Sequence, residues 1–236
     1  MTAVFTVTVR QLAGSRRSWL VLVLAALPIL AAALFRVAET TTTPRDYADD
    51  ITASLVASAI LPLVMLLLGV AAFGNEVSDR TLVYLTTKPL ARWRIVLPKL
   101  AATLLVGGVP VAISGALAIA LIEQGDLKGA LATAGGLAAG AAAYAAIFTW
   151  AGLALRHALV AGLVYVFVWE AVLAAYLDGI RFLSVRGFAL GVVNGLDAER
   201  LTDAELAAGA ASIGVVLVLV GFTALAIRKL TKMDVP

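Results

Sequence analysis

The sequence predicts an all-α, polytopic membrane protein with six transmembrane helices. Hydrophobic residues make up 62% of the 236 residues, whereas a soluble globular domain contains roughly 45–50%. The charged residues, 14% of the chain, stand between long apolar runs, as expected from the cost of placing a charge inside a bilayer. We therefore expect a single transmembrane domain over residues 1–236.

Six apolar runs are candidates for crossing the membrane, which takes about 20 residues. They are residues 19–35, 51–74, 97–122, 130–155, 159–177 and 206–227. The first run is short, but Arg36 at its end can extend to the membrane surface. Because Arg36 also interrupts the run before any small-residue cleavage site, we interpret it as a span and not as a signal peptide. Pro28, Pro62 and Pro110 lie inside runs, where we expect them to kink the helices.

The first 18 residues predict an interfacial helix ahead of the first span. Val4, Phe5 and Leu12 alternate there with Arg10 and Gln11, a mixture typical of a helix that lies along a membrane surface.

The distribution of Lys and Arg predicts the orientation of the chain. If the N-terminus is cytoplasmic, twelve of the 18 Lys and Arg fall in cytoplasmic segments and six in external ones, which agrees with the positive-inside rule. The C-terminus is then cytoplasmic as well, since six crossings return the chain to the side where it began.

The longest cytoplasmic connection, residues 75–99, predicts two short coupling helices. Glu76 and Arg80 are four residues apart and can pair on one helix face, and Pro89 suits the first turn of a second helix that carries Trp93. A topological anchor needs only a few basic residues, so this length and aromatic content favour a docking surface for a partner protein.

The external segment 178–205 is too apolar for a free loop. It contains Ile180, Phe182, Leu183 and Phe188 among its charges. We expect an extracytoplasmic helical hairpin between spans five and six.

Glu170 is an acid inside the fifth predicted span, beside Trp169. A carboxylate at that depth must be neutral, paired or near water. Two interpretations remain open: a group on a substrate or proton pathway, and a hydrogen bond in helix packing. Partners for the second are Trp169, Tyr144, Thr149 and Arg181.

The segment Gly136–Leu–Ala–Ala–Gly140 in the fourth span has the small-xxx-small pattern of a close helix contact. The contact can be internal to the bundle or lie between subunits, and we expect the internal one.

Several kinds of chemistry have no support in the sequence. There is no cysteine, and His157 is the single histidine, so a thiol nucleophile and a cysteine or multi-histidine metal site are excluded. No phosphate-binding loop of the form G-x-x-x-x-G-K-[ST] occurs. We expect no enzyme, cofactor or metal site in this chain. The net charge of +3 comes from residues at span ends, so no nucleic-acid partner is expected.

The order of these elements resembles the six-span permease subunits of type-2 ABC exporters. The sharpest match lies in the connection between spans two and three, where Glu76 is followed by Arg80-Thr81, Leu82 to Leu85, Lys88-Pro89, Arg92 and Lys99. Many relatives have Gly-Thr where this chain has Arg80-Thr81. A second match, Trp169-Glu170 followed by residues 181–184, looks like a subgroup that includes permeases of the nitrous-oxide reductase maturation type.

The resemblance implies a separate ABC ATP-binding subunit that holds MgATP and docks on the connection between spans two and three. It implies a working unit of two permeases, identical or different, and two ATPases, exporting a substrate across the plasma membrane of a prokaryote. The implied coupling residues are Glu76, Asp79, Arg80, Thr81, Leu82, Leu85, Lys88, Pro89 and Arg92, with a smaller contact at Arg156 and His157 between spans four and five.

Two other functions remain open from the residues alone. The first is an ion-coupled secondary transporter that uses Glu170, although no repeated halves are evident in the sequence. The second is a membrane assembly factor that transports nothing.

Overall fold

The chain forms a bundle of helices in the computed structural model, which describes residues 2–38, 41–78, 91–173, 183–201 and 206–232. No strand occurs in these ranges, so the all-α prediction is confirmed. In chain order the helices are α1 (Thr2–Ala13), α2 (Arg16–Val37), α3 (Pro44–Asp50), η1 (Ile51–Ile60), α4 (Leu61–Ser78), α6 (Trp93–Thr103), η2 (Leu104–Gly108), α7 (Val109–Ile122), α8 (Leu127–Ala154), α9 (Ala158–Val164), η3 (Tyr165–Leu173), α11 (Val185–Leu196) and α12 (Ala208–Lys232). The η segments are π-helical and continue the helices beside them.

Among the described residues, five helical stretches are long and apolar enough to cross a membrane. They are Arg17–Val37, Pro44–Gly74, Trp93–Ile122, Leu127–Ala154 and Ala208–Lys232. At 1.5 Å per residue the shortest reaches roughly 30 Å, the thickness of the hydrocarbon core. These stretches correspond to five of the six predicted spans, and the protein is a multi-pass membrane protein.

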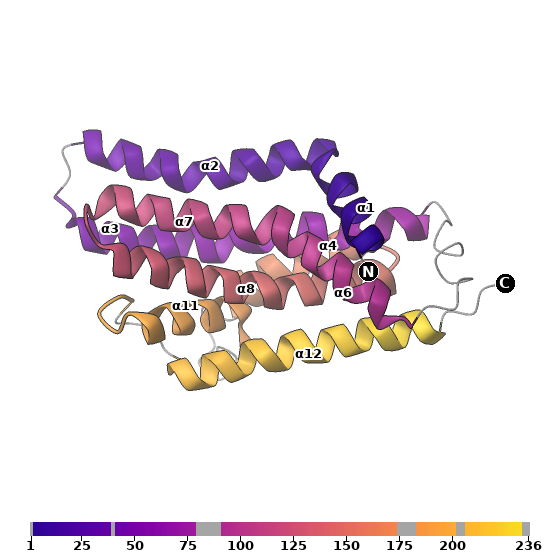
Figure 1. Ribbon diagram of the computed structural model, residues 1–236. Helices are drawn as coiled ribbons and strands as arrows, with labels where there is room; N and C mark the ends of the chain where they lie inside the picture. Colours follow the sequence, from indigo (N-terminus) through magenta and orange to yellow (C-terminus); the bar gives the residue numbers. More distant parts are fainter. Residues whose placement is uncertain (1, 39–40, 79–90, 174–182, 202–205, 233–236) are drawn as a thin grey trace.

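The bundle has two ends, which we name after the helices that lie there (Figure 1). The α1 end holds α1, the end of α4, the start of α6 and the last turn of α12, and the α3 end holds α3 and the turn between α7 and α8. The chain thus returns to the end where it began.

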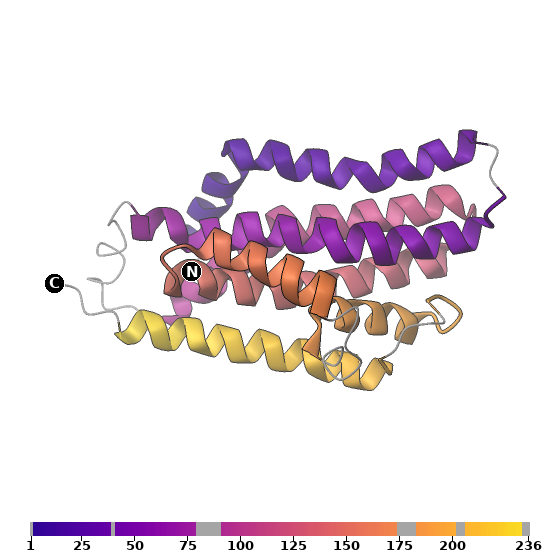
Figure 2. The same ribbon diagram turned by 180° about the vertical axis from the view of Figure 1, so that it is seen from behind.

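The fifth predicted span differs from a single continuous helix. Its apolar residues form α9 and η3, and the shorter helix α11 follows toward the α3 end (Figure 2). The N–H of Val185 donates to the Glu170 carboxylate at 2.9 Å, so α11 begins beside η3 inside the bundle. Residues 185–196 pack against α8 and α12. They belong to the segment 178–205, for which the sequence predicts an extracytoplasmic helical hairpin.

Glycine residues of α8 explain how α11 fits into the bundle. A Cβ on Gly136 would meet the Val193 side chain at 2.3 Å, and one on Gly140 would meet Ala189 at 2.8 Å. The backbones of α8 and α11 can approach this closely only because these positions lack side chains. The internal-packing interpretation of Gly136–Gly140 is confirmed.

The helices differ in how much they bury. In the stretch Pro44–Gly74, 72% of the apolar window is buried, whereas the corresponding share is 22% in both α2 and α12. Trp19, Leu34, Ile213 and Leu217 are among the exposed side chains of these two outer helices. The helices η1–α4 and α8 form the core, and the apolar surface of α2 and α12 suits contact with lipid.

Two of the three predicted proline sites coincide with π-helical turns. The N–H of Leu61, directly before Pro62, bonds to the carbonyl five residues back, at Val56. The N–H of Val109, directly before Pro110, bonds in the same way to Leu104. Proline lacks an N–H and its ring clashes with the carbonyl four residues earlier, and a widened turn accommodates both effects.

The predicted leader helix is present as α1 and buries Thr8 and Leu12. It lies against the start of α6 at the α1 end (Figure 1). The turn to α2 is held by the Ser18 hydroxyl, which donates to the carbonyl of Leu12 at 2.7 Å.

Candidate functional site

A buried ion pair joins the end of α4 to the start of α6. The Lys99 side chain is 1% exposed, and its Nζ lies 2.7 Å from Glu76 Oε1. The ammonium also donates to the carbonyl of Ala72 and lies 4.6 Å from the centre of the Phe73 ring. We call Lys99, Glu76, Ala72 and Phe73 the lysine clamp.

The lysine clamp joins α4 and α6, the two helices between which the predicted docking connection runs. Glu76 and Lys99 are 23 residues apart in sequence, and the residues between them belong mainly to the connection. The predicted coupling residues Asp79, Arg80, Thr81, Leu82, Leu85, Lys88 and Pro89 lie outside the described residues. Because breaking a buried ion pair is destabilising, the clamp fixes the spacing of α4 and α6 at this end.

Exposed basic and aromatic side chains lie beside the lysine clamp in the first turn of α6. Trp93 is 42% exposed, and the Arg94 guanidinium lies 5.3 Å from its ring centre. Arg92 directly precedes α6 and is half-buried. These residues begin the third long helix, whereas the sequence analysis had them on a separate short helix.

Arg156 and His157 lie at the same end of the bundle, in the short turn between α8 and α9, and both are exposed. Just before this turn α8 packs directly on the backbone of α4, because a Cβ on Gly152 would meet the carbonyl oxygen of Val70 at 2.6 Å. The structure therefore places Arg156 and His157 at the same end of the bundle as Glu76 and Arg92, although the two pairs are separate in sequence.

Glu170 lies in η3, is 2% exposed, and accepts four hydrogen bonds. Tyr165 Oη donates at 2.8 Å and Ser184 Oγ at 2.6 Å. The backbone N–H of Val185 donates at 2.9 Å and that of Arg186 at 3.4 Å. All four partners are donors, which suits a carboxylate because it carries only acceptors.

Glu170 thereby caps α11 from a different helix. The first N–H groups of a helix have no partner within it, and negative charge near that terminus is favourable. Glu170 takes two of these N–H groups, while the side chain of Ser184, the N-cap residue, accepts from the N–H of Gly187 at 3.0 Å. The carboxylate therefore fixes where α11 begins.

The donors to Glu170 differ from the partners expected from the sequence. Tyr144 and Thr149 are buried on α8, and neither hydroxyl has a hydrogen-bond partner among the described residues. Trp169 is half-buried, and Arg181 lies outside the described residues. Ser184 and Tyr165 were missed, although Tyr165 is five residues before Glu170, the spacing that a π-helical turn brings together.

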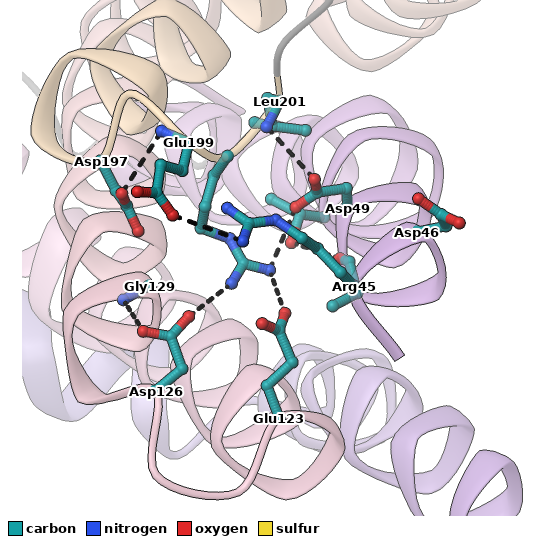
Figure 3. Close-up of polar contacts among 12 residues, drawn as sticks. Arg45, Asp46, Asp49, Glu123, Asp126, Gly129, Asp197, Glu199 and Leu201 are labelled. Carbon is teal, nitrogen blue, oxygen red and sulfur yellow. Dashed lines mark hydrogen bonds and ion pairs between the residues drawn. The ribbon is translucent and has the colours of Figure 1, made fainter. Parts of the chain in front are cut away.

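A third polar centre, also missed, lies at the α3 end around Arg200 (Figure 3). The Arg200 side chain is fully buried and forms ion pairs with Asp49 at 3.0 Å, Glu123 at 2.8 Å and Asp126 at 2.9 Å. The N–H of Leu201, at φ +50°, donates to Asp49 at 3.2 Å. We call Arg200 and its three carboxylates the arginine cluster.

The arginine cluster connects three parts of the chain: α3, the turn between α7 and α8, and the segment after α11. Two further ion pairs lie at its edge, Lys128–Asp197 at 2.9 Å and Arg45–Glu199 at 3.6 Å. The hydrogen bond from Lys128 holds the pKa of Asp197 below its ordinary value. From the sequence, these charges indicated only the orientation of the chain in the membrane, because no local spacing connects residues 49, 126 and 200.

The long apolar helices, with exposed basic and aromatic groups at one end and buried polar centres within, define a multi-pass membrane protein. The chain matches the model of the family described as ABC-2 family transporter protein over residues 15–174, which is more than half of its length. The protein therefore belongs to the ABC-2 family and is the membrane-spanning permease component of an ABC transporter. A comparison with curated proteins found no match, and a comparison with solved structures found none.

The matched residues include the lysine clamp, Arg156, His157 and Glu170. They end before α11. The arginine cluster is completed by Arg200, which lies beyond the match.

Proposed function

We propose that this permease is driven by a separate ATP-binding subunit that docks at the α1 end. The observation that carries this proposal is the lysine clamp, because its ion pair joins α4 and α6, the two helices between which the predicted docking connection runs. The exposed Trp93 and Arg94 and the exposed Arg156 and His157 lie at that same end, and they offer a partner two contact regions.

The proposed mechanism transmits motion through the lysine clamp. MgATP, bound by the partner and not by this chain, closes a pair of ATP-binding subunits, and the docked connection moves with them. Lys99 Nζ and Glu76 Oε1 are 2.7 Å apart. Because this ion pair ties α4 to α6, the two helices move together. The working unit comprises two permeases, and export is the proposed direction since the sequence resembles exporters.

Docking is tested by co-purification of the ATP-binding subunit with surface variants of the permease. We expect Trp93→Ala with Arg94→Glu, or Arg80→Glu, to reduce recovery of the partner about tenfold, corresponding to about 1.4 kcal/mol of binding free energy. Arg45→Glu changes an exposed cation at the α3 end and is the control. Normal recovery with the α1-end variants, or equal loss with the control, would refute the docking site.

Transmission is tested separately with Glu76→Gln, which removes a charge that is largely covered. We expect the partner still to bind but ATP turnover no longer to respond to the permease. Wild-type coupling of ATP turnover in this variant would remove the lysine clamp from the mechanism.

The proposed topology has six crossings, with α9, η3 and α11 together making the fifth, and with both termini in the cytoplasm of a prokaryotic cell. Because the chain has no cysteine, a single introduced thiol is a unique label. Lys88→Cys should react only with a membrane-permeant reagent, and Thr42→Cys also with an impermeant one. The opposite pattern would reverse the orientation and exclude docking at the α1 end.

The ion-coupled alternative is less well supported. It requires Glu170 to exchange a proton, whereas the acceptors of this carboxylate are engaged in capping α11. The assembly-factor alternative predicts no ATP-dependent movement of any substrate in vesicles that contain the complex.

A further inference from the structure

A cleft of about 270 Å³ lies between η1 and η3, with α11 at its side. Its polar lining consists of Ser54, Ser58 and Arg186, and its apolar lining includes Leu63, Val166 and Phe167. The cleft therefore combines a cation and two hydroxyls with a hydrophobic wall.

The cleft lies below the α3 end of the bundle. Ser54 and Ser58 follow Asp49 of the arginine cluster by five and nine residues along one helix. At 1.5 Å per residue these distances are roughly 7 and 13 Å, so the two serines lie in the half of the bundle nearer the α3 end. Leu63 is a further turn toward the middle.

Arg186 is the unusual member of the lining because it lacks a described counter-charge. Its Nε is buried without a hydrogen-bond partner, and no ion pair joins its guanidinium to a carboxylate among the residues that the structure describes. Its backbone N–H, and not its side chain, contacts Glu170. A cation at membrane depth is costly unless an anion compensates it.

The hydroxyls determine where an anion can bind. Ser54 Oγ donates to Asp50 Oδ1 at 2.7 Å, so the outer rim of the cleft is acidic and repels a second negative charge. Ser58 Oγ donates to the carbonyl of Ser54, and it can rotate toward a ligand. A single anionic group therefore fits beside Arg186 and Ser58, deeper than Asp50.

We propose that this cleft binds an amphiphile through one anionic headgroup, with phosphate as the best match to a guanidinium. The headgroup contacts Arg186 and Ser58, and the acyl chain follows Leu63, Val166 and Phe167 toward the middle of the bundle. This order, polar near the α3 end and apolar deeper, is that of a lipid in the adjoining leaflet. The proposal concerns the permease alone and does not depend on ATPase docking.

The test measures binding by native mass spectrometry of the detergent-solubilised permease without ATP. The probes are phosphatidylglycerol, diacylglycerol, which lacks the phosphate, and inorganic phosphate, which lacks the acyl chains. We expect Arg186→Gln to weaken phosphatidylglycerol binding about tenfold and to leave diacylglycerol binding unchanged. Lys128→Gln, which removes an exposed cation at the α3 end, is the matched control.

Arg186→Gln should fold, since α11 is capped through the backbone of residue 186, and thermal unfolding checks this. Ser58→Ala is the second variant, with an expected loss of about threefold. Unchanged phosphatidylglycerol binding in both variants overturns the proposal. Equal loss in Lys128→Gln indicates non-specific charge attraction, and full competition by inorganic phosphate indicates a free-anion site; either result overturns the amphiphile as ligand.

Discussion

The two ends of the bundle use buried charge differently. At the α1 end one lysine pairs with one carboxylate across a single connection, between α4 and α6. At the α3 end one arginine meets three carboxylates and joins segments 74 to 151 residues apart. The α3 end is therefore cross-linked as a unit, whereas the clamp at the α1 end joins two neighbouring helices among the residues that the structure describes. This difference favours movement at the α1 end, where the proposed partner acts.

The largest expected effect comes from breaking the arginine cluster. Arg200→Met leaves Asp49, Glu123 and Asp126 facing one another without a cation, and we expect a loss of about 4 kcal/mol in the free energy of unfolding. Denaturant unfolding in detergent measures it. Adding Glu123→Gln and Asp126→Asn to this variant should recover much of the loss. If Arg200→Met unfolds with the same free energy as wild type, the arginine cluster does not cross-link the α3 end.

A somewhat smaller effect is expected midway between the ends. Glu170→Leu leaves four donors unpartnered and should cost about 3 kcal/mol, while Glu170→Gln retains an acceptor oxygen and should cost about 1 kcal/mol. Protease sensitivity of the region around α11 provides the local readout. If the two substitutions behave equally, Glu170 does not act as the cap.

Breaking the lysine clamp should cost less, about 2 kcal/mol for Lys99→Met, because Glu76 keeps some contact with solvent and can rehydrate. The double variant with Glu76→Gln should lie close to wild type in unfolding, and the cycle of four proteins isolates the pair. If Lys99→Met lowers the free energy of unfolding more than Arg200→Met does, the α1 end is the more strongly held of the two, and the contrast drawn above is wrong.

The smallest effect is a pH dependence at the edge of the arginine cluster. The pKa of Asp197 is lowered by its bond from Lys128, so the folded state binds this proton less readily than the unfolded chain. The stabilisation is present above about pH 4, the ordinary aspartate pKa, and is lost as pH falls through the lower folded value.

The readout is the melting temperature of wild type and Asp197→Asn between pH 6 and pH 3. The two curves should converge on acidification, and salt should narrow their separation because Lys128 is exposed. A separation that grows as pH falls would contradict the assignment.

Hydropathy and charge placement predicted the five long spans, because the bilayer imposes a length and an apolar composition that one sequence can display. Glu76, Lys99 and Glu170 were recognised individually, but their contacts were not, since Lys99 meets Glu76 across a connection and Glu170 meets Ser184 across a helix break. The burial of α11 against α8 was not predicted, because it depends on Gly136 and Gly140 of another helix. In the sequence Arg200 resembles an ordinary loop arginine, because its three acidic partners lie far from it along the chain.

The contact between Gly152 and the backbone of Val70 has a mechanical consequence. Because no side chain separates them at this point, the backbones of α4 and α8 are in direct contact. The end of α4 and the turn after α8 therefore belong to one packed unit, and we expect them to move together. Alanine at position 152 would force the two helices apart at this contact, and we expect it to weaken that coupling.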